Sequence, residues 1–300
     1  MLSILLPVYN FPCLDLVRDL AAQARQMDVP IEIICIDDCS SQYKEDNRPI
    51  QNIPACTYIE LTENIGRSRI RNLLASKAQY DYVLFIDCDS KISTSGYIQN
   101  YIKEVQQYDI VAGGTLYESS PPSDTAYYLH WKYGSVREPK PDHRQDKVFT
   151  SNNFIIKKEI IEKYPFNEQI VRYGHEDSFF QMALEKDQLF IHYINNPVIH
   201  IGLETTVRFF AKTRESMMNL RDLYVGGAIA ETDIPKIRLL KSYLRIKRYR
   251  AQTVFSIFYP LIHFLNYKIN FSRHPNLLLL DLYKLAYFIR ILAFTDENNS

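Results

Sequence analysis

Two carboxylates separated by one residue follow an apolar run in the first third of the chain. Residues 83–86 are apolar at successive positions, as expected for a strand covered on both faces, and Asp87 and Asp89 come directly after them. Side chains two apart on an extended chain point the same way, so the carboxylates are expected to converge. They are hard oxygen ligands, suited to Mg²⁺ or Mn²⁺ that bridges the phosphates of a nucleotide. The alternative is a strand end solvated by acids.

A second pair of acids, Asp37 and Asp38, ends the apolar run at residues 33–36. A carboxylate at this position can accept a hydrogen bond from a nucleobase imide or a ribose hydroxyl, and an Asx turn is the alternative. The pair also resembles the Mg²⁺ pocket of phosphoacceptor receiver domains. A signalling module therefore stays open, although the chain length and the second ordered block of the chain count against it.

Residues 64–72, with the sequence NIGRSRIRN, are expected to open a helix after a third strand. Gly66 permits close backbone approach, a helix N-terminus favours anions, and Arg71 can reach a phosphate or a base. A glycine turn followed by a solvated basic helix face is the alternative interpretation.

Glu176 and Asp177 stand at the start of another expected helix. A carboxylate there can take the proton of an acceptor hydroxyl, which is a poor nucleophile until that proton leaves. The alternative is a pair of acids that cap the helix and complement its dipole. His200 follows the apolar run at residues 197–199 and either completes a metal shell or is a hydrogen-bonded core histidine.

These side chains need a common edge, and the order of apolar runs and amphipathic stretches in residues 1–118 provides one. Helices are expected between the strands, as in a parallel sheet. The polar residues after the strands then share the carboxyl edge, where open α/β sheets bind ligands. Strands are expected at residues 3–9, 31–36, 57–61 and 82–86, a mobile loop at 119–147, and helical patterns at 155–164, 178–184 and 207–223.

Composition narrows the class of protein. The 35 basic and 35 acidic residues argue against a general nucleic-acid binder. The five cysteines are odd in number and lie outside zinc-type spacings, which favours a reducing compartment. Residues 2–6 are apolar but short, lack a basic leader and end at Pro7, so they indicate a buried strand rather than a secretory signal. A cytoplasmic protein is therefore expected.

Taken in order, the segments SILLPVYN, EIICIDDCS, NIGRSRIRN, YVLFIDCDS and YGHEDSFF resemble the inverting family 2 glycosyltransferases of the GT-A fold. The resemblance covers about residues 1–225. It implies an α/β fold in which a nucleotide-binding, mostly parallel sheet is flanked by helices. Residues 1–118 would form the nucleotide-binding half, residues 119–225 the acceptor half, and residues 226–300 a helical C-terminal appendage.

The resemblance also implies roles for individual residues. Asp177 is implied as the general base and Glu176 as an acceptor-side partner, with Mn²⁺ or Mg²⁺ as the cofactor. Trp131 and Asn153 are implied as acceptor contacts. The residues implied to hold the metal are Asp89, Asp87 and His200. Those implied to line the nucleotide-sugar site are Pro7, Tyr9, Asn10, Asp38, Asn64, Gly66, Arg71, Asp87 and Cys88.

The implied reaction is a single displacement at the anomeric carbon, with inversion of configuration. It transfers a sugar from a nucleotide diphosphate, UDP by family habit, to a saccharide or lipid-linked saccharide in cell-surface glycan synthesis. Two departures from the family pattern are present. Ile70 stands where relatives often carry alanine, and the acidic pair lies in YGHED rather than in the tryptophan-rich version of polysaccharide polymerases, which weakens an expectation of processive synthesis.

Two other functions remain open at this point. A catalytically silent sugar-binding or assembly protein on the same fold would bind nucleotide without turnover. A sugar nucleotidyltransferase shares the sheet and the metal acids, but would be expected to carry a glycine-rich phosphate loop after its first strand, where residues 7–10 read PVYN.

The C-terminal region is first basic and then apolar. Residues 236–250 contain seven basic side chains and no acidic one. Residues 253–267 and 276–294 are apolar-rich but are interrupted by polar and charged side chains, which oppose insertion across a membrane. Residues 236–294 therefore fit either amphipathic helices on an anionic membrane surface, at the inner face and near a lipid-linked acceptor, or a helical cap on the catalytic domain.

Overall fold

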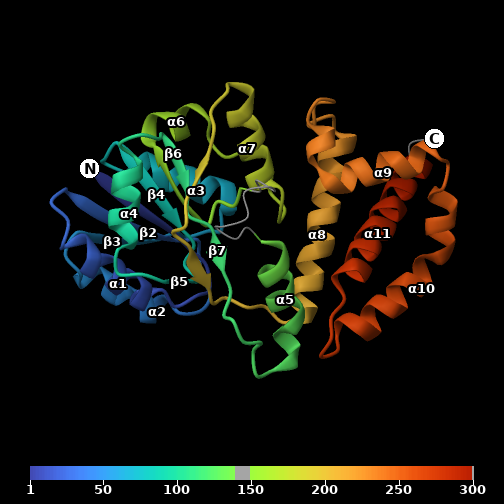
Figure 1. Ribbon diagram of the computed structural model, residues 1–300, viewed down its shortest axis with the longest axis horizontal. Helices are drawn as coiled ribbons and strands as arrows, with labels where there is room; N and C mark the ends of the chain where they lie inside the picture. The colour runs from blue at the N-terminus through green and yellow to red at the C-terminus, as the bar shows by residue number, and fades with distance from the viewer. Residues whose placement is uncertain (139–148, 299–300) are drawn as a thin grey trace. The chain divides into compact units, whose positions relative to one another are not determined.

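The structure is a computed structural model that describes residues 1–138 and 149–298, with side chains up to residue 293. Figure 1 shows its helices and strands with the labels used below. The chain divides into two compact units. The first comprises Met1–Ser119, Arg137–Val171 and Glu176–Gly202, and the second comprises Ser120–Val136, Arg172–His175 and Leu203–Ser300. The second unit includes residues that the sequence assigned to the acceptor half, and the predicted domain limits stay predictions.

The first unit is built on a seven-stranded, mostly parallel sheet with the order β3-β2-β1-β4-β8-β6-β9. The strands β3, β2, β1 and β4 pair with one another in parallel, and so do β6 and β9, whereas β8 is antiparallel to both β4 and β6. The four expected strands are confirmed to within one residue at each end. The bounds are β1 Leu2–Val8, β2 Ile31–Asp37, β3 Cys56–Glu60, β4 Tyr82–Ile86, β6 Ile110–Ala112, β8 Asn153–Lys157 and β9 His192–Tyr193.

Apolar side chains on both faces hold this sheet between two layers of helices. Along β1, Ile4 and Leu6 face one core while Leu5 faces the other, because successive strand residues point to opposite sides. The first core contains side chains from α1 and α4, and the second contains side chains from α3, α6 and α7. The helices and short turns of this unit are α1 Leu14–Ala24, α2 Lys44–Asn47, η1 Arg48–Asn52, α3 Arg67–Lys77, α4 Tyr97–Glu104, α6 Lys158–Lys163 and α7 Glu176–Lys186.

A second, three-stranded sheet connects distant parts of the first unit. Its order is β5-β10-β7, with β5 at Ser90–Ile92, β7 at Thr115–Leu116 and β10 at Val198–His200. The pairing of β10 with β5 sets His200 opposite Ser90. This register brings the histidine beside the acid that precedes β5, although more than 100 residues separate them in the sequence.

The second unit is helical and has its own core. Leu129, Phe210, Tyr259 and Tyr283 are among its buried members. The rings of Tyr259 on α10 and Tyr283 on α11 stack where these two helices pack together. None of the described helices combines the length and the apolarity to cross a membrane. The elements are η2 Thr125–Tyr127, α5 Tyr128–Arg137, α8 Thr206–Val225, η3 Ile234–Lys236, α9 Arg238–Arg248, α10 Gln252–Asn270 and α11 Leu277–Asn298.

Two expectations about local structure are wrong. Residues 125–137 were expected within an irregular loop, but they form η2 and α5, because Leu129 packs into the core of the second unit and fixes the helix there. Residues 139–147 of that loop lie outside the described residues. Residues 153–157 were partly expected as helix, but they form β8, because the open edge of β4 and the strand β6 pair with them.

Candidate active site

Two acids at the carboxyl edge of β2, Asp37 and Asp38, accept hydrogen bonds from the protein itself. Asp37 is fully buried and accepts hydrogen bonds from the Ser40 backbone N–H at 2.7 Å and from the Tyr58 hydroxyl at 3.1 Å. Asp38 accepts from the backbone N–H groups of Ile65 at 2.7 Å and Gly66 at 3.0 Å. Burial raises the pKa of Asp38, and these two N–H groups oppose the rise. The acids therefore shape the turns around the edge.

These contacts fix the turn that leads into α3. Gly66 has a φ of +85°, which side-chain-bearing residues rarely adopt, and the amide of Asn64 donates to the Asp38 carbonyl at 3.0 Å. No described atom lies within 4 Å of the position that a Gly66 Cβ would take. The turn thus leaves open space beside a row of backbone groups, as a nucleotide site requires.

Residues at the end of β1 complete this part of the edge. Asn10 accepts from the backbone N–H groups of Ser41 and Gln42 at 2.8 and 3.1 Å, so its side chain holds the loop after β2. Tyr9 as a residue is 49% exposed, so its ring can stack on a base. Pro7 lies in β1 and is half-buried. The structure therefore brings Pro7, Tyr9, Asn10, Asp38, Asn64 and Gly66 to one edge, and their contacts with a nucleotide stay a prediction.

Arg71 joins α3 to the end of β4. The residue is only 3% exposed, and its guanidinium donates to Asp87 Oδ1 at 2.7 Å. The guanidinium also lies over the ring of Phe166, 5.6 Å from its centre. A buried charge needs a partner, and Asp87 supplies it. Arg71 was predicted beside the base and ribose pocket, and in this structure it positions Asp87.

Glu176 and Asp177 begin α7, which packs on the same face of the sheet as α3. Burial, and then repulsion from Glu176, raises the pKa of Asp177 to about 6, while Arg71 and a hydrogen bond with Ser151 oppose the rise. Glu176 is 6% exposed and accepts from Arg67 at 3.4 Å. Among the described residues, Glu176 Oε2 and Asp177 Oδ1 have no hydrogen-bond partner. Two buried carboxylate oxygens are therefore available to a ligand.

Asp89 and His200 form a second acidic group at the edge. Asp89 Oδ1 lies 3.5 Å from His200 Nδ1, and the Ile201 backbone N–H donates to the Asp89 carbonyl at 2.9 Å. A Cβ on Gly202 would lie 2.5 Å from Asp89 Oδ2, so the absent side chain makes room for this carboxylate. Burial lowers the pKa of His200, but Asp89, together with Glu138 and Asp87, outweighs it and raises the pKa to about 9.

Sequence reasoning missed several residues of this group. The Tyr117 hydroxyl donates to Glu138 at 2.8 Å, and its ring centre lies 5.1 Å from that of His200. Burial raises the pKa of Glu138. Tyr117 precedes the segment expected to be a loop, and Glu138 lies within that segment. Only Gly202, two residues after His200, carried a signal that the sequence could have used.

The metal prediction rests on a partial donor set. The described part of the chain gathers no group of three or more histidine, cysteine or acidic side chains around one point. Asp89 and His200 are adjacent, and their side chains are 29% and 14% exposed, whereas Asp87 is turned to Arg71. One carboxylate and one imidazole fit the share of a Mn²⁺ shell that a protein contributes when phosphates and water supply the rest.

Three residues that were predicted to contact the donor or the acceptor lie in other surroundings. Asn153 is buried, and its amide accepts from Tyr97 and Tyr101 and donates to the carbonyls of Gly114 and Asn196. An acceptor contact would require one of these bonds to be exchanged. Cys88 belongs to the first core, and burial raises the pKa of its thiol. Trp131 lies on α5 in the second unit, and its contact with an acceptor stays a prediction.

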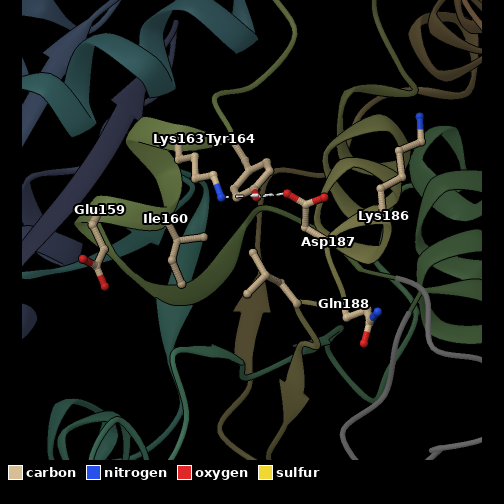
Figure 2. A pocket seen from close by; sticks show the side chains of 8 residues that line it. Glu159, Ile160, Lys163, Tyr164, Lys186, Asp187 and Gln188 are labelled. Carbon is tan, nitrogen blue, oxygen red and sulfur yellow. Dashed lines mark hydrogen bonds and ion pairs between the residues drawn. The ribbon is translucent and has the colours of Figure 1, made fainter.

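A hollow at the ends of α6 and α7 is separate from this site. Figure 2 shows Lys163 and Tyr164 facing Asp187, to which both side chains are paired. Because β8 runs antiparallel to β4, α6 begins at the edge opposite Asp87. The hollow therefore lies away from the acidic groups at the carboxyl edge.

Comparison with known proteins identifies the family. Residues 3–165 match the family model described as Glycosyl transferase family 2. One curated relative, "Putative colanic acid biosynthesis glycosyl transferase WcaA" of Escherichia coli (strain K12), is 26% identical over 147 residues, which are 43% of this chain and 52% of the relative. The chain thus spans about half the length of the curated relative that it matches.

Two solved structures share the fold at low identity. The mannosyltransferase PcManGT from Pyrobaculum calidifontis, in complex with GDP-Man and Mn²⁺, has a TM-score of 0.58 and 14% identity, covering 98% of this chain and 86% of that chain. Mannosyl-3-phosphoglycerate synthase from Rubrobacter xylanophilus has a TM-score of 0.53 and 14% identity, covering 77% and 76%. With a family model matched over more than half of its residues, this chain belongs to glycosyl transferase family 2 and has the GT-A fold.

Proposed function

We propose that this glycosyltransferase moves a sugar from a nucleotide diphosphate donor to an acceptor hydroxyl, with inversion and with Asp177 as the general base. The observation that carries the proposal is the position of Asp177 at the start of α7, beside the buried Glu176, with its own Oδ1 atom buried and within the field of Arg71 and Asp87. A carboxyl with a pKa of about 6 is ionised at neutral pH and is a stronger proton acceptor than an ordinary aspartate.

The donor would occupy the edge formed by β1, β2 and the turn before α3. Tyr9 offers an exposed ring to a base, and the open space at Gly66 admits the backbone of a nucleotide. Asp38 holds that turn through two backbone N–H groups, so its role is to set the shape of the pocket. PcManGT was solved with GDP-Man, which supports a nucleotide diphosphate donor. UDP is the first nucleotide that we would test.

Asp89 and His200, with Asp87 beside them, would hold Mn²⁺ or Mg²⁺. When bound, the metal supplies positive charge that offsets the charge growing on the departing diphosphate. Arg71 fixes the orientation of Asp87, and Gly202 leaves the space in which the Asp89 carboxylate lies. Glu176 contributes a buried carboxylate oxygen that can orient the acceptor hydroxyl next to Asp177.

For the acceptor and the compartment, we propose only a general class. The curated relative is named for colanic acid biosynthesis, and we propose a saccharide or lipid-linked saccharide acceptor in cell-surface glycan synthesis. All five cysteines are free in the structure, which supports a reducing compartment such as the cytoplasm.

Thermal stabilisation by nucleotides tests this proposal, because a ligand that binds only the folded state raises its stability. UDP, GDP, CMP and dTDP are each compared with and without Mn²⁺. A shift in Tm for one nucleoside diphosphate that requires Mn²⁺, followed by turnover of the matching donor sugar, is expected. Binding without turnover of any donor would favour a catalytically silent protein, and no binding at all would contradict the proposed site.

A further inference from the structure

The outer face of α10 is an apolar stripe exposed on the second unit. Six side chains at the spacing of one helix face make up this stripe, and each is between 39% and 68% exposed. They are Val254, Ile257, Phe258, Leu261, Phe264 and Leu265. From the first to the last, they extend about 17 Å along the helix axis. Exposed apolar patches that are continuous in this way mark interaction sites rather than ordinary surface.

The opposite face of α10 is already occupied by the protein. Tyr259 and Ile262 belong to the core of the second unit, and Tyr259 stacks near Tyr283 of α11. Asn270 is fully buried and accepts from the Asn276 backbone N–H at 2.6 Å. Figure 1 shows α11 between α10 and α8. The orientation of α10 is thus fixed by packing, and the stripe is the face that remains for a partner.

The charge around the stripe identifies the kind of partner. Residues 234–280 contain nine lysines and arginines and no aspartate or glutamate, although the whole chain has equal numbers of basic and acidic residues. The remaining residues therefore carry an excess of nine acidic over basic side chains. On α9, Lys241, Arg245 and Arg248 are exposed and lie at the spacing of one helix face.

The basic segment leads directly into the stripe. Arg250 is exposed and precedes Val254 by four residues, a stretch that spans at most about 14 Å. An anionic lipid surface satisfies both features, because phosphate headgroups attract the basic side chains and the boundary with the acyl chains accepts the apolar ones. A second copy of this chain fits less well, since it would bring two strongly basic segments together.

We propose that the outer face of α10, with the basic residues of α9, binds the surface of an anionic phospholipid bilayer with α10 lying along it. This function is independent of the sugar transfer proposed above, because it requires neither a donor nor a metal.

Sedimentation of the purified full chain with vesicles tests the proposal. Vesicles of phosphatidylcholine alone are compared with vesicles that also contain phosphatidylglycerol. The chain is expected to sediment with the anionic vesicles and to be released by salt. Replacing Phe258, Leu261 and Phe264 by serine should weaken this binding roughly tenfold or more, and replacing Lys241, Arg245 and Arg248 by glutamine should reduce its dependence on salt.

The matched control replaces three exposed apolar residues outside α10, namely Val171, Phe190 and Val207, by serine. Circular dichroism and the Tm of each variant show whether it is folded. Binding that is absent in the wild type, or unchanged in the folded Phe258, Leu261 and Phe264 variant, would overturn the proposal. A dimer in the absence of vesicles that the same variant converts to a monomer would identify a second copy as the occupant instead.

Discussion

Acids end both β2 and β4, yet the structure uses the two groups in opposite ways. Asp37 and Asp38 together accept four hydrogen bonds from nearby protein donors, and these bonds hold the turns at the edge of the sheet. Asp87 and Asp89 instead face the charged side chains of Arg71 and His200, and the neighbouring Asp177 keeps a buried oxygen that no described residue bonds. The sequence pattern is the same, and the kind of partner separates scaffold from site: neutral backbone and hydroxyl donors hold the first pair, and charged side chains face the second.

The largest effect is expected for Asp177→Asn. The amide keeps the shape of the side chain but cannot accept the acceptor proton, so kcat should fall by roughly 10²- to 10⁴-fold while the affinity for nucleotide is retained. Steady-state kinetics and the nucleotide-induced shift in Tm measure the two quantities. Asp187→Asn, just beyond the other end of α7, is the matched control. Near-normal turnover in Asp177→Asn would remove this residue from the base role.

On the scaffold side of the comparison, Asp37→Ala should destabilise the fold. The change leaves the Ser40 N–H and the Tyr58 hydroxyl without their acceptor in the interior, which costs about 2–4 kcal/mol in the free energy of unfolding. Denaturant titration measures this loss. The control is Asp15→Ala, because the Asp15 side chain is 93% exposed. A loss no greater than in the control would show that Asp37 is not a structural acid.

The pH dependence of stability should also separate the groups. Because the pKa of Asp177 is raised to about 6, the folded state holds a proton that the unfolded chain has lost between about pH 4 and pH 6. Stability from this residue is therefore lost as the pH rises through that window. The free energy of unfolding of Asp177→Asn relative to the wild type should increase by roughly 1–3 kcal/mol between about pH 4 and pH 7.

Activity should change in the opposite direction over the same range. The base must be ionised, so kcat/KM of the wild type is expected to rise up to about pH 6 and then to level off. Asp187→Asn should follow the wild type in both measurements. A stability difference for Asp177→Asn that does not vary with pH would mean that the pKa of Asp177 is not raised in the folded protein.

The sequence predicted those features of the fold and site that depend on local pattern. The strands at residues 31–37 and 82–86 and the acids at their ends follow from apolar runs that end in carboxylates. Strand β8 was missed because a run of five residues is too short to distinguish strand from helix, and its partners β4 and β6 are distant in the chain. The contact between Tyr117 and Glu138 was missed for a related reason, since tertiary packing alone brings them to His200.

The smallest effects are expected at two glycines, one beside each group of acids. Gly66→Ala meets open space but must keep a φ of +85°, so it should lower the free energy of unfolding by about 1–2 kcal/mol. Gly202→Ala has no such φ, but its Cβ would come within 2.5 Å of the Asp89 carboxylate, which must turn away. This variant should therefore weaken the Mn²⁺-dependent affinity for nucleotide severalfold, with a smaller effect on stability.

Denaturant titration and nucleotide titration with and without Mn²⁺ give both quantities for each variant. The two glycines serve as controls for each other, because each places one methyl group beside an acid at the same edge of the sheet. If Gly66→Ala instead lost metal-dependent affinity and Gly202→Ala did not, the roles assigned to the two groups of acids would have to be exchanged. Asp38 would then be the acid that governs metal-dependent binding, and the open oxygens at the start of α7 would not mark where the metal and donor bind.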